Sequence, residues 1–266
     1  MPEYDDNPAG RLRTLLLELG KMPPNVLAWE GLAEILVPGA SRSTPDVFRA
    51  MTLLMDLPVD IRNAVAALDE EDEEEKEHLV EHLEKVEAFL VTTASRSASL
   101  SHALQSTFAP GGDVANSAAV QSLSTCSRRL HRCSPEPVIP QQELDELVGA
   151  VNSLMNDIRA SSLNGAAKSL LLHHLHRLLQ ALDLIRITGA APVEESLDAF
   201  FGAVSRNAEV MQDARRLSFA ERLAAVASTI RTAFDIARGV HQLGAEAHTV
   251  IEQGTRVIEQ AGRLLP

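Results

Sequence analysis

The sequence predicts an all-α protein, and three observations support this fold class. Apolar residues make up 45% of the 266-residue chain but aromatic residues only 3%, so the core must consist of Leu, Ala, Val and Ile. No segment shows the sustained two-residue alternation that is expected of strands. Several segments repeat leucine at three- and four-residue spacing, which is the period of one helix face. We therefore predict a helical bundle with an internally duplicated helical hairpin and a C-terminal amphipathic helix or helix pair.

The predicted duplication rests on a pattern that occurs twice, an Asp-Ile-Arg start followed by a lysine, a leucine, a His-Leu pair and a closing Leu and Phe. The first copy contains Asp60-Ile61-Arg62, Lys76, Leu79, His82-Leu83, Leu104 and Phe108. The second copy contains Asp157-Ile158-Arg159, Lys168, Leu171, His174-Leu175, Leu197 and Phe201. Duplicated helical units serve architecture, since each buries its apolar face against the other.

The pattern divides the chain into three parts. Residues 1–56 are predicted to be short helices behind a frayed polar tail at 1–10. Residues 57–202 hold the two copies, at about 57–108 and 141–202, with a Ser/Pro-rich connector between them. Residues 203–266 form a heptad-patterned helical region. We expect the helix that begins near Pro45 to extend only to Pro58, because proline breaks helix interiors. The acidic run from Asp69 to Glu75 is predicted to be a solvated loop.

The C-terminal region carries apolar and small residues at steps of three and four, the pattern of a helix packed along a partner helix. The positions predicted to make this contact are Ile230, Phe234, Val240, Gly244, Ala247, Ile251, Gly254 and Ile258. Each glycine inside a helix costs about 1 kcal/mol relative to alanine. We therefore expect a break or kink near Gly239, followed by a second amphipathic helix.

Histidines supply the candidate metal ligands. His78, Glu81 and His82 match the H-x-x-E-H pattern of the inverted zinc proteases, in which two histidines bind zinc and the glutamate acts as a base. That family needs a large α/β domain, which this sequence does not contain. We therefore expect no metal here.

A second histidine cluster comprises His173, His174 and His176. His174 is the counterpart of His82 in the other copy, so the two residues are candidates for a shared metal site or a pH-sensitive contact. We favour the interpretation that both hydrogen-bond locally at a helix boundary. We predict no cofactor and no catalytic residue.

One dense basic patch stands out in an acidic protein. Arg128, Arg129 and Arg132 lie between two cysteines, Cys126 and Cys133, that are too few and too far apart for a zinc knuckle by themselves. The arginines are candidates to receive a phosphate, a nucleotide or an acidic strip of a partner. Pairing with the chain's own acidic run is the alternative.

Charge and composition narrow the function. A net charge of −13 argues against nucleic-acid binding and disfavours an anionic bilayer. Two cysteines and no signal peptide indicate a reducing cytoplasm, and arginine in excess of lysine indicates a bacterial gene. The predicted function is non-catalytic protein–protein interaction or oligomerisation, with another protein or a second copy as the partner. The alternatives are a membrane-associated effector using the Gly-rich C-terminal helix and a metal-dependent enzyme using the histidines.

Overall fold

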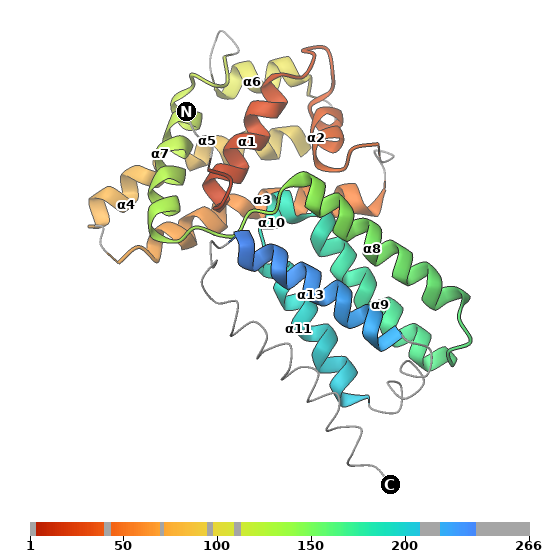
Figure 1. The fold of residues 1–266 in the computed structure, drawn as a ribbon. Coiled ribbons are helices and arrows are strands. Elements are labelled where there is room, and N and C mark those ends of the chain that lie inside the picture. The colour runs from red at the N-terminus through yellow and green to blue at the C-terminus, as the bar shows by residue number, and fades with distance from the viewer. Residues whose placement is uncertain are drawn as a thin grey trace. The chain divides into compact units, whose positions relative to one another are not determined.

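The computed structural model describes residues 4–39, 44–69, 72–94, 98–108, 113–207 and 219–237 (Figure 1). Every regular element in these ranges is a helix, which confirms the all-α fold class. The one strand-like feature that they contain is an isolated bridge between Leu27 and Ser99. No helix in the described part of the chain is long and apolar enough to span a membrane.

The chain forms two compact units. The first contains residues 1–136 and 186–189, and the second contains residues 137–185 and 190–266. The boundaries that we predicted at 56/57 and 202/203 fall inside helices. The two predicted copies lie in different units, apart from the short return at 186–189. The duplication itself remains a prediction.

The first unit is built around its first helix, α1, which contacts α2, α3 and α7. Helices α5 and α6 pack against each other and against α2, and α4 lies against α3 and α7. The bounds are α1 Pro8–Gly20, α2 Ala28–Leu36, α3 Pro45–Ala66, α4 Glu73–Val80, α5 Leu83–Ala94, α6 Leu100–Thr107, α7 Ala118–Cys133 and α10 Ile185–Thr188.

Helix α3 continues through Pro58, so our prediction that it ends there is wrong. Proline inside a helix removes a backbone hydrogen bond and costs about 3 kcal/mol. Core residues flank Pro58 on both sides. Leu57 and Ile61 are fully buried, and so is Leu54 one turn earlier. Each such side chain contributes roughly 1.5–3 kcal/mol on burial, which offsets the cost of the proline.

The acidic run begins a helix where we predicted a solvated loop. The Asp72 carboxylate accepts a hydrogen bond from the Glu75 backbone N–H at 2.8 Å and so caps α4. Glutamates occupy the first turn of α4, where the positive end of the helix dipole stabilises their negative charge. Residues 70 and 71 lie outside the described ranges.

The segment from residue 4 to residue 10 is packed against α7, so the predicted frayed tail is wrong for these residues. Asn7 caps α1 by accepting a hydrogen bond from the Gly10 N–H at 2.9 Å. Its side-chain amide donates to the carbonyl oxygen of Ser127 at 3.1 Å, and the Ser127 hydroxyl donates to the carbonyl oxygen of Tyr4 at 2.9 Å. These bonds hold the segment because they satisfy polar groups that burial removes from water.

A buried arginine on α1 joins the end of the first unit's main segment to the segment that returns at 186–189. Arg11 is 7% exposed, and its guanidinium pairs with the Glu136 carboxylate at 2.6 Å. Its Nε donates to the carbonyl oxygen of Ile187 at 3.0 Å. Gly189 adopts a φ of +74°, and a Cβ there would lie 2.1 Å from a Glu136 oxygen. Glycine is therefore required at this point of the returning segment.

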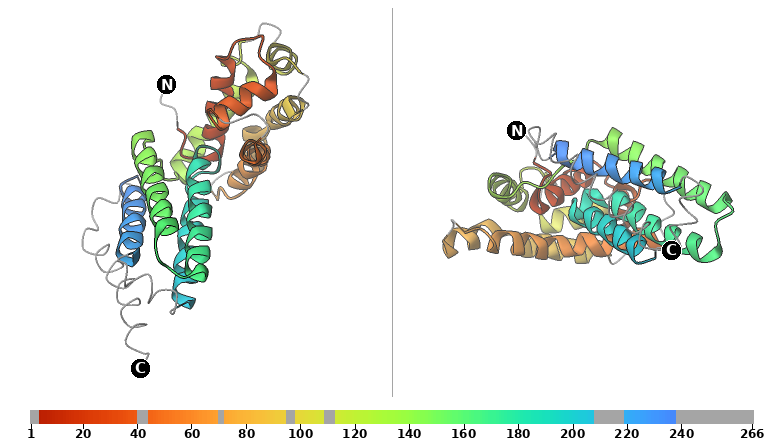
Figure 2. Two further views of the ribbon diagram at one scale, coloured as in Figure 1. Left: turned by 90° about the vertical axis from the view of Figure 1, so that its right-hand side faces the viewer. Right: turned by 60° about the horizontal axis from the view of Figure 1, so that its bottom comes forward.

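In the described part of the second unit, four helices run side by side (Figure 2). They are α8 Gln141–Ala160, α9 Gly165–Asp183, α11 Ala191–Arg206 and α13 Phe219–Ala237. Helix α9 contacts α8 and α11, and α8 contacts α13. Leucines at helical spacing form the core, such as Leu171, Leu175 and Leu178 on α9. The leucine stripes predicted from the sequence therefore face inward.

We predict that Gly10→Ala destabilises the protein. A Cβ on Gly10 would lie 1.6 Å from the Tyr4 carbonyl oxygen, so the N-terminal segment must move off α1. We expect a loss of about 1–3 kcal/mol in the free energy of unfolding, measured by urea titration.

Gly149→Ala is the matched control for that variant. Gly149 lies inside α8, and a Cβ there would meet nothing within 4 Å. The substitution should raise the free energy of unfolding by roughly 0.5–1 kcal/mol, because alanine has less chain entropy to lose in a helix. Equal effects of the two substitutions would contradict the packing described here.

Candidate functional site

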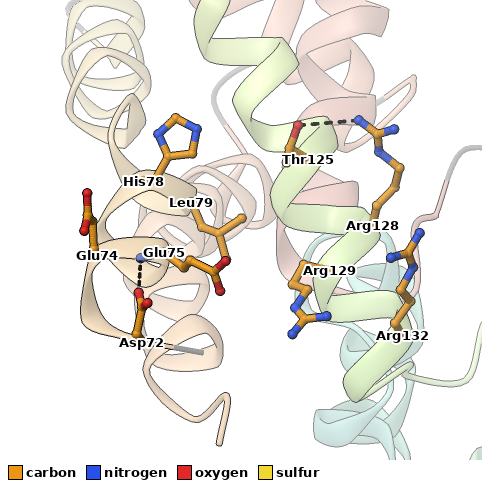
Figure 3. Close-up of a pocket in the computed structure, with 9 residues that line it drawn as sticks. All are labelled: Asp72, Glu74, Glu75, His78, Leu79, Thr125, Arg128, Arg129 and Arg132. Atoms are coloured by element: carbon orange, nitrogen blue, oxygen red, sulfur yellow. Dashed lines mark hydrogen bonds between the residues drawn. The ribbon is translucent and has the colours of Figure 1, made fainter. Parts of the chain in front are cut away.

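A groove of about 710 Å³ lies between α4 and α7 in the first unit. Its residues come from both helices, and they are Asp72, Glu74, Glu75, His78, Leu79, Thr125, Arg128, Arg129 and Arg132 (Figure 3). The groove thus has an anionic wall on α4 and a cationic wall on α7. The tertiary structure brings the predicted basic patch beside part of the predicted acidic run.

The arginines of the cationic wall follow from the amphipathic pattern of α7. Val120, Leu123 and Leu130 are buried on one face of this helix, so the arginines lie on its polar side. They belong to the last two turns, near the negative end of the helix dipole, which stabilises positive charge. Arg128 is held along its own helix, since its Nε donates to the carbonyl oxygen of Ser124 at 3.2 Å.

The anionic wall is the first turn and a half of α4. Glu75 and Leu79 project from α4 toward α7, and Arg129 projects from α7 toward α4 (Figure 3). The Ser122 hydroxyl donates to the carbonyl oxygen of Leu79 at 3.5 Å and links the two helices. Lys76 donates to the carbonyl oxygen of Ala66 at 3.4 Å and links α4 to the end of α3.

The arginines of the groove are suited to binding an anionic group. Their guanidinium groups donate strong, directional hydrogen bonds to carboxylate or phosphate oxygens. The nine lining residues include no cysteine or serine and only one histidine. No group among them combines a nucleophile with an orienting base.

His131 lies within the predicted basic patch but does not join the groove. Its ring stacks on Tyr4 with a centroid distance of 3.8 Å, and its Nδ1 contacts the Asp6 carboxylate. Both partners lie about 125 residues away in sequence. No local sequence pattern signals this contact, so it was not among our predictions.

The residues of the H-x-x-E-H match do not lie on one continuous helix. Helix α4 ends at Val80 and α5 begins at Leu83, so His78 lies in a helix and His82 in the turn that follows. The motif requires both histidines on one face of a continuous helix. His78 lies 3.2 Å from Glu81, and both side chains are more than half exposed.

The second histidine cluster lies in the middle of α9. The half-buried His174 ring packs near Phe200, with a centroid distance of 5.9 Å, and meets the His173 ring edge-on. His176 is exposed, and its Nδ1 lies 3.0 Å from the Leu172 carbonyl oxygen. His82 belongs to the first unit and His174 to the second. Within the described ranges, no three His, Cys, Asp or Glu residues are grouped to hold a metal ion.

The predicted interaction series divides at the end of α13. Ile230 and Phe234 are buried in the core of the second unit, at 0% and 2% exposure, together with Leu223 and Ala227. The first half of the series therefore packs within the chain. The remaining positions lie outside the described residues: Val240, Gly244, Ala247, Ile251, Gly254 and Ile258. Gly239, where we predicted a break or kink, also lies outside them.

The two cysteines differ sharply in environment. Cys126 is fully buried in α7, and burial raises the pKa of its thiol to about 12. Cys133 is exposed at the end of the same helix, and neither forms a disulfide. Cys126 is therefore a packing residue and is unsuited to act as a nucleophile.

No protein-family model, curated protein or solved structure matches this chain.

We predict that His174 makes the protein less stable as the pH falls. Burial lowers the pKa of His174, and the charges of His173, Arg177 and Arg206 lower it further. The unfolded chain then takes up a proton near pH 6.5, before the folded protein does. The free energy of unfolding should fall as the pH drops from about 7.5 to about 5.

His174→Gln should flatten this pH dependence, measured by urea titration at each pH. His176→Gln on the exposed side of α9 is the control and should keep the wild-type slope. If the wild type and His174→Gln lose stability in parallel, His174 does not contribute in this way.

We also predict that one thiol reacts in the native protein and two react after denaturation. Iodoacetamide labelling followed by peptide mass spectrometry should place the native label on Cys133 alone. Cys133→Ser should abolish native labelling. Rapid modification of Cys126 in the folded protein would contradict its burial.

Proposed function

We propose that this protein is a non-catalytic helical interaction protein that binds another protein, or a second copy of itself, through the apolar series that follows α13. The supporting observation is the burial of Leu223, Ala227, Ile230 and Phe234, where the same spacing marks a packed helix face. From Val240 to Ile258 the sequence continues at this spacing. We infer that this continuation also packs against a helix.

The chemistry of the described residues supports a binding role. The cysteine in the core is protected by burial, and the charged groove offers hydrogen-bond donors for an anionic group. Two free thiols are consistent with a reducing compartment, and we place the protein in the cytoplasm.

A test of the proposal places charges in the predicted contact face of the full chain. Ile251→Asp combined with Ile258→Asp should abolish association, because two carboxylates would be buried without partners. We expect light scattering to report an oligomer for the wild type and the 28.8 kDa monomer for the double variant.

Gln253→Asp combined with Gln260→Asp is the matched control, since it adds the same charge outside the apolar series. This control should associate as the wild type does. A wild-type chain that is monomeric and retains no protein of its native host would contradict the proposal. Flotation of the wild type with anionic vesicles, lost in the isoleucine variant, would instead favour the membrane-associated alternative.

A further inference from the structure

We propose that the arginine face of α7, formed by Arg128, Arg129 and Arg132, is a docking surface for an acidic segment of a partner protein, and that α4 competes for this surface within the chain. The surface lies in the first unit and shares no residue with the C-terminal series. This proposal can therefore be tested independently of the function proposed above.

Helix α4 contributes no buried residue to the core of the first unit, whereas α1, α2, α3, α5, α6 and α7 each contribute several. Leu79 and Val80 are only half-buried. The hydrophobic effect scales with the area removed from water, so α4 gains less from its position than its neighbours do.

Helix α4 is strongly acidic. Its sequence from Asp72 to Glu81 is dominated by carboxylates, and it lies against the helix that bears the arginines. Glu75 faces Arg129 across the groove (Figure 3). The acidic helix is thus an internal example of the ligand that the arginine face accepts.

The spacing of the charges favours a helical acidic segment. Arg128 and Arg132 lie four residues apart, so they share one face of α7 at about one helical turn. Carboxylates at three- or four-residue spacing on a facing helix match this repeat, and Asp72 and Glu75, which line the groove in this chain, are three residues apart. Each guanidinium also has the planar fork that binds a carboxylate with two hydrogen bonds.

A protein carboxylate fits this surface better than a polyphosphate. Nucleic acids carry closely spaced phosphates and are repelled by a chain of net charge −13. A short acidic peptide engages only the local arginines, and it carries charge of the same sign as α4. Neutralising α4 should therefore strengthen binding, because it removes both the competitor and the repulsion.

The experiment uses the full chain and a fluorescein-labelled peptide that copies residues 69–80. Fluorescence anisotropy at low salt measures the dissociation constant. We expect Glu74→Gln combined with Glu75→Gln, which keeps the Asp72 cap, to bind the peptide about fivefold more tightly than the wild type. Adding Arg128→Gln and Arg132→Gln should weaken that binding by about tenfold or more. Raising the salt to about 0.5 M should abolish it.

Two controls separate this proposal from a general charge effect. Arg159→Gln combined with Arg177→Gln removes two exposed arginines from the second unit and should leave peptide binding unchanged. Circular dichroism must report wild-type helix content for every variant. A peptide with glutamine at all acidic positions should not bind.

The proposal is overturned if the neutralised variant does not bind the acidic peptide, or if the groove arginines can be replaced without loss. It is also overturned if an oligothymidylate of equal charge binds more tightly than the peptide, since that result would assign the surface to phosphate. Because the C-terminal isoleucines are untouched, either result leaves the oligomerisation test unaffected.

Discussion

The first unit depends on the burial of one cation. Arg11 cannot lose its proton, so its place in the core requires acceptors that replace water. It finds them in Glu136 and in the carbonyl oxygen of Ile187, which lie 125 and 176 residues further along the chain. One side chain therefore closes two long loops at the same point of α1. Removing Glu136 would leave the buried guanidinium with one acceptor fewer and so destabilise the unit.

Charge at helix ends organises the rest of that unit. The acidic first turn of α4 and the arginines in the last turns of α7 each lie at the helix end that stabilises their sign. Two favourable helix ends thus become the opposite walls of one groove. The acidic protein thus carries a cationic surface on α7, with the carboxylates of α4 beside it. The charges that stabilise the two helix ends are also the charges available for binding.

Helix type and inward faces were predictable because hydrophobic period is a local property. Leu171 and Leu175 of α9 are buried as their spacing predicts, whereas Ile230 and Phe234 of α13 pack within the chain and not against the partner that we predicted for them. The same reasoning failed at Pro58 and at the acidic run. In both cases a local rule for ending a helix was outweighed, by core burial around the proline and by capping at Asp72.

The fold class, the buried leucine stripe of α9 and the residues of the cationic patch follow from the sequence alone. Periodicity and composition are enough for the first two, because they report which side chains avoid water. The approach of Arg129 to Glu75, the bond from Asn7 to Ser127 and the ion pair of Arg11 with Glu136 depend on tertiary packing. Such contacts join residues distant along the chain, and their geometry depends on how whole helices pack. The candidate groove likewise depends on tertiary packing, since neither α4 nor α7 forms it alone.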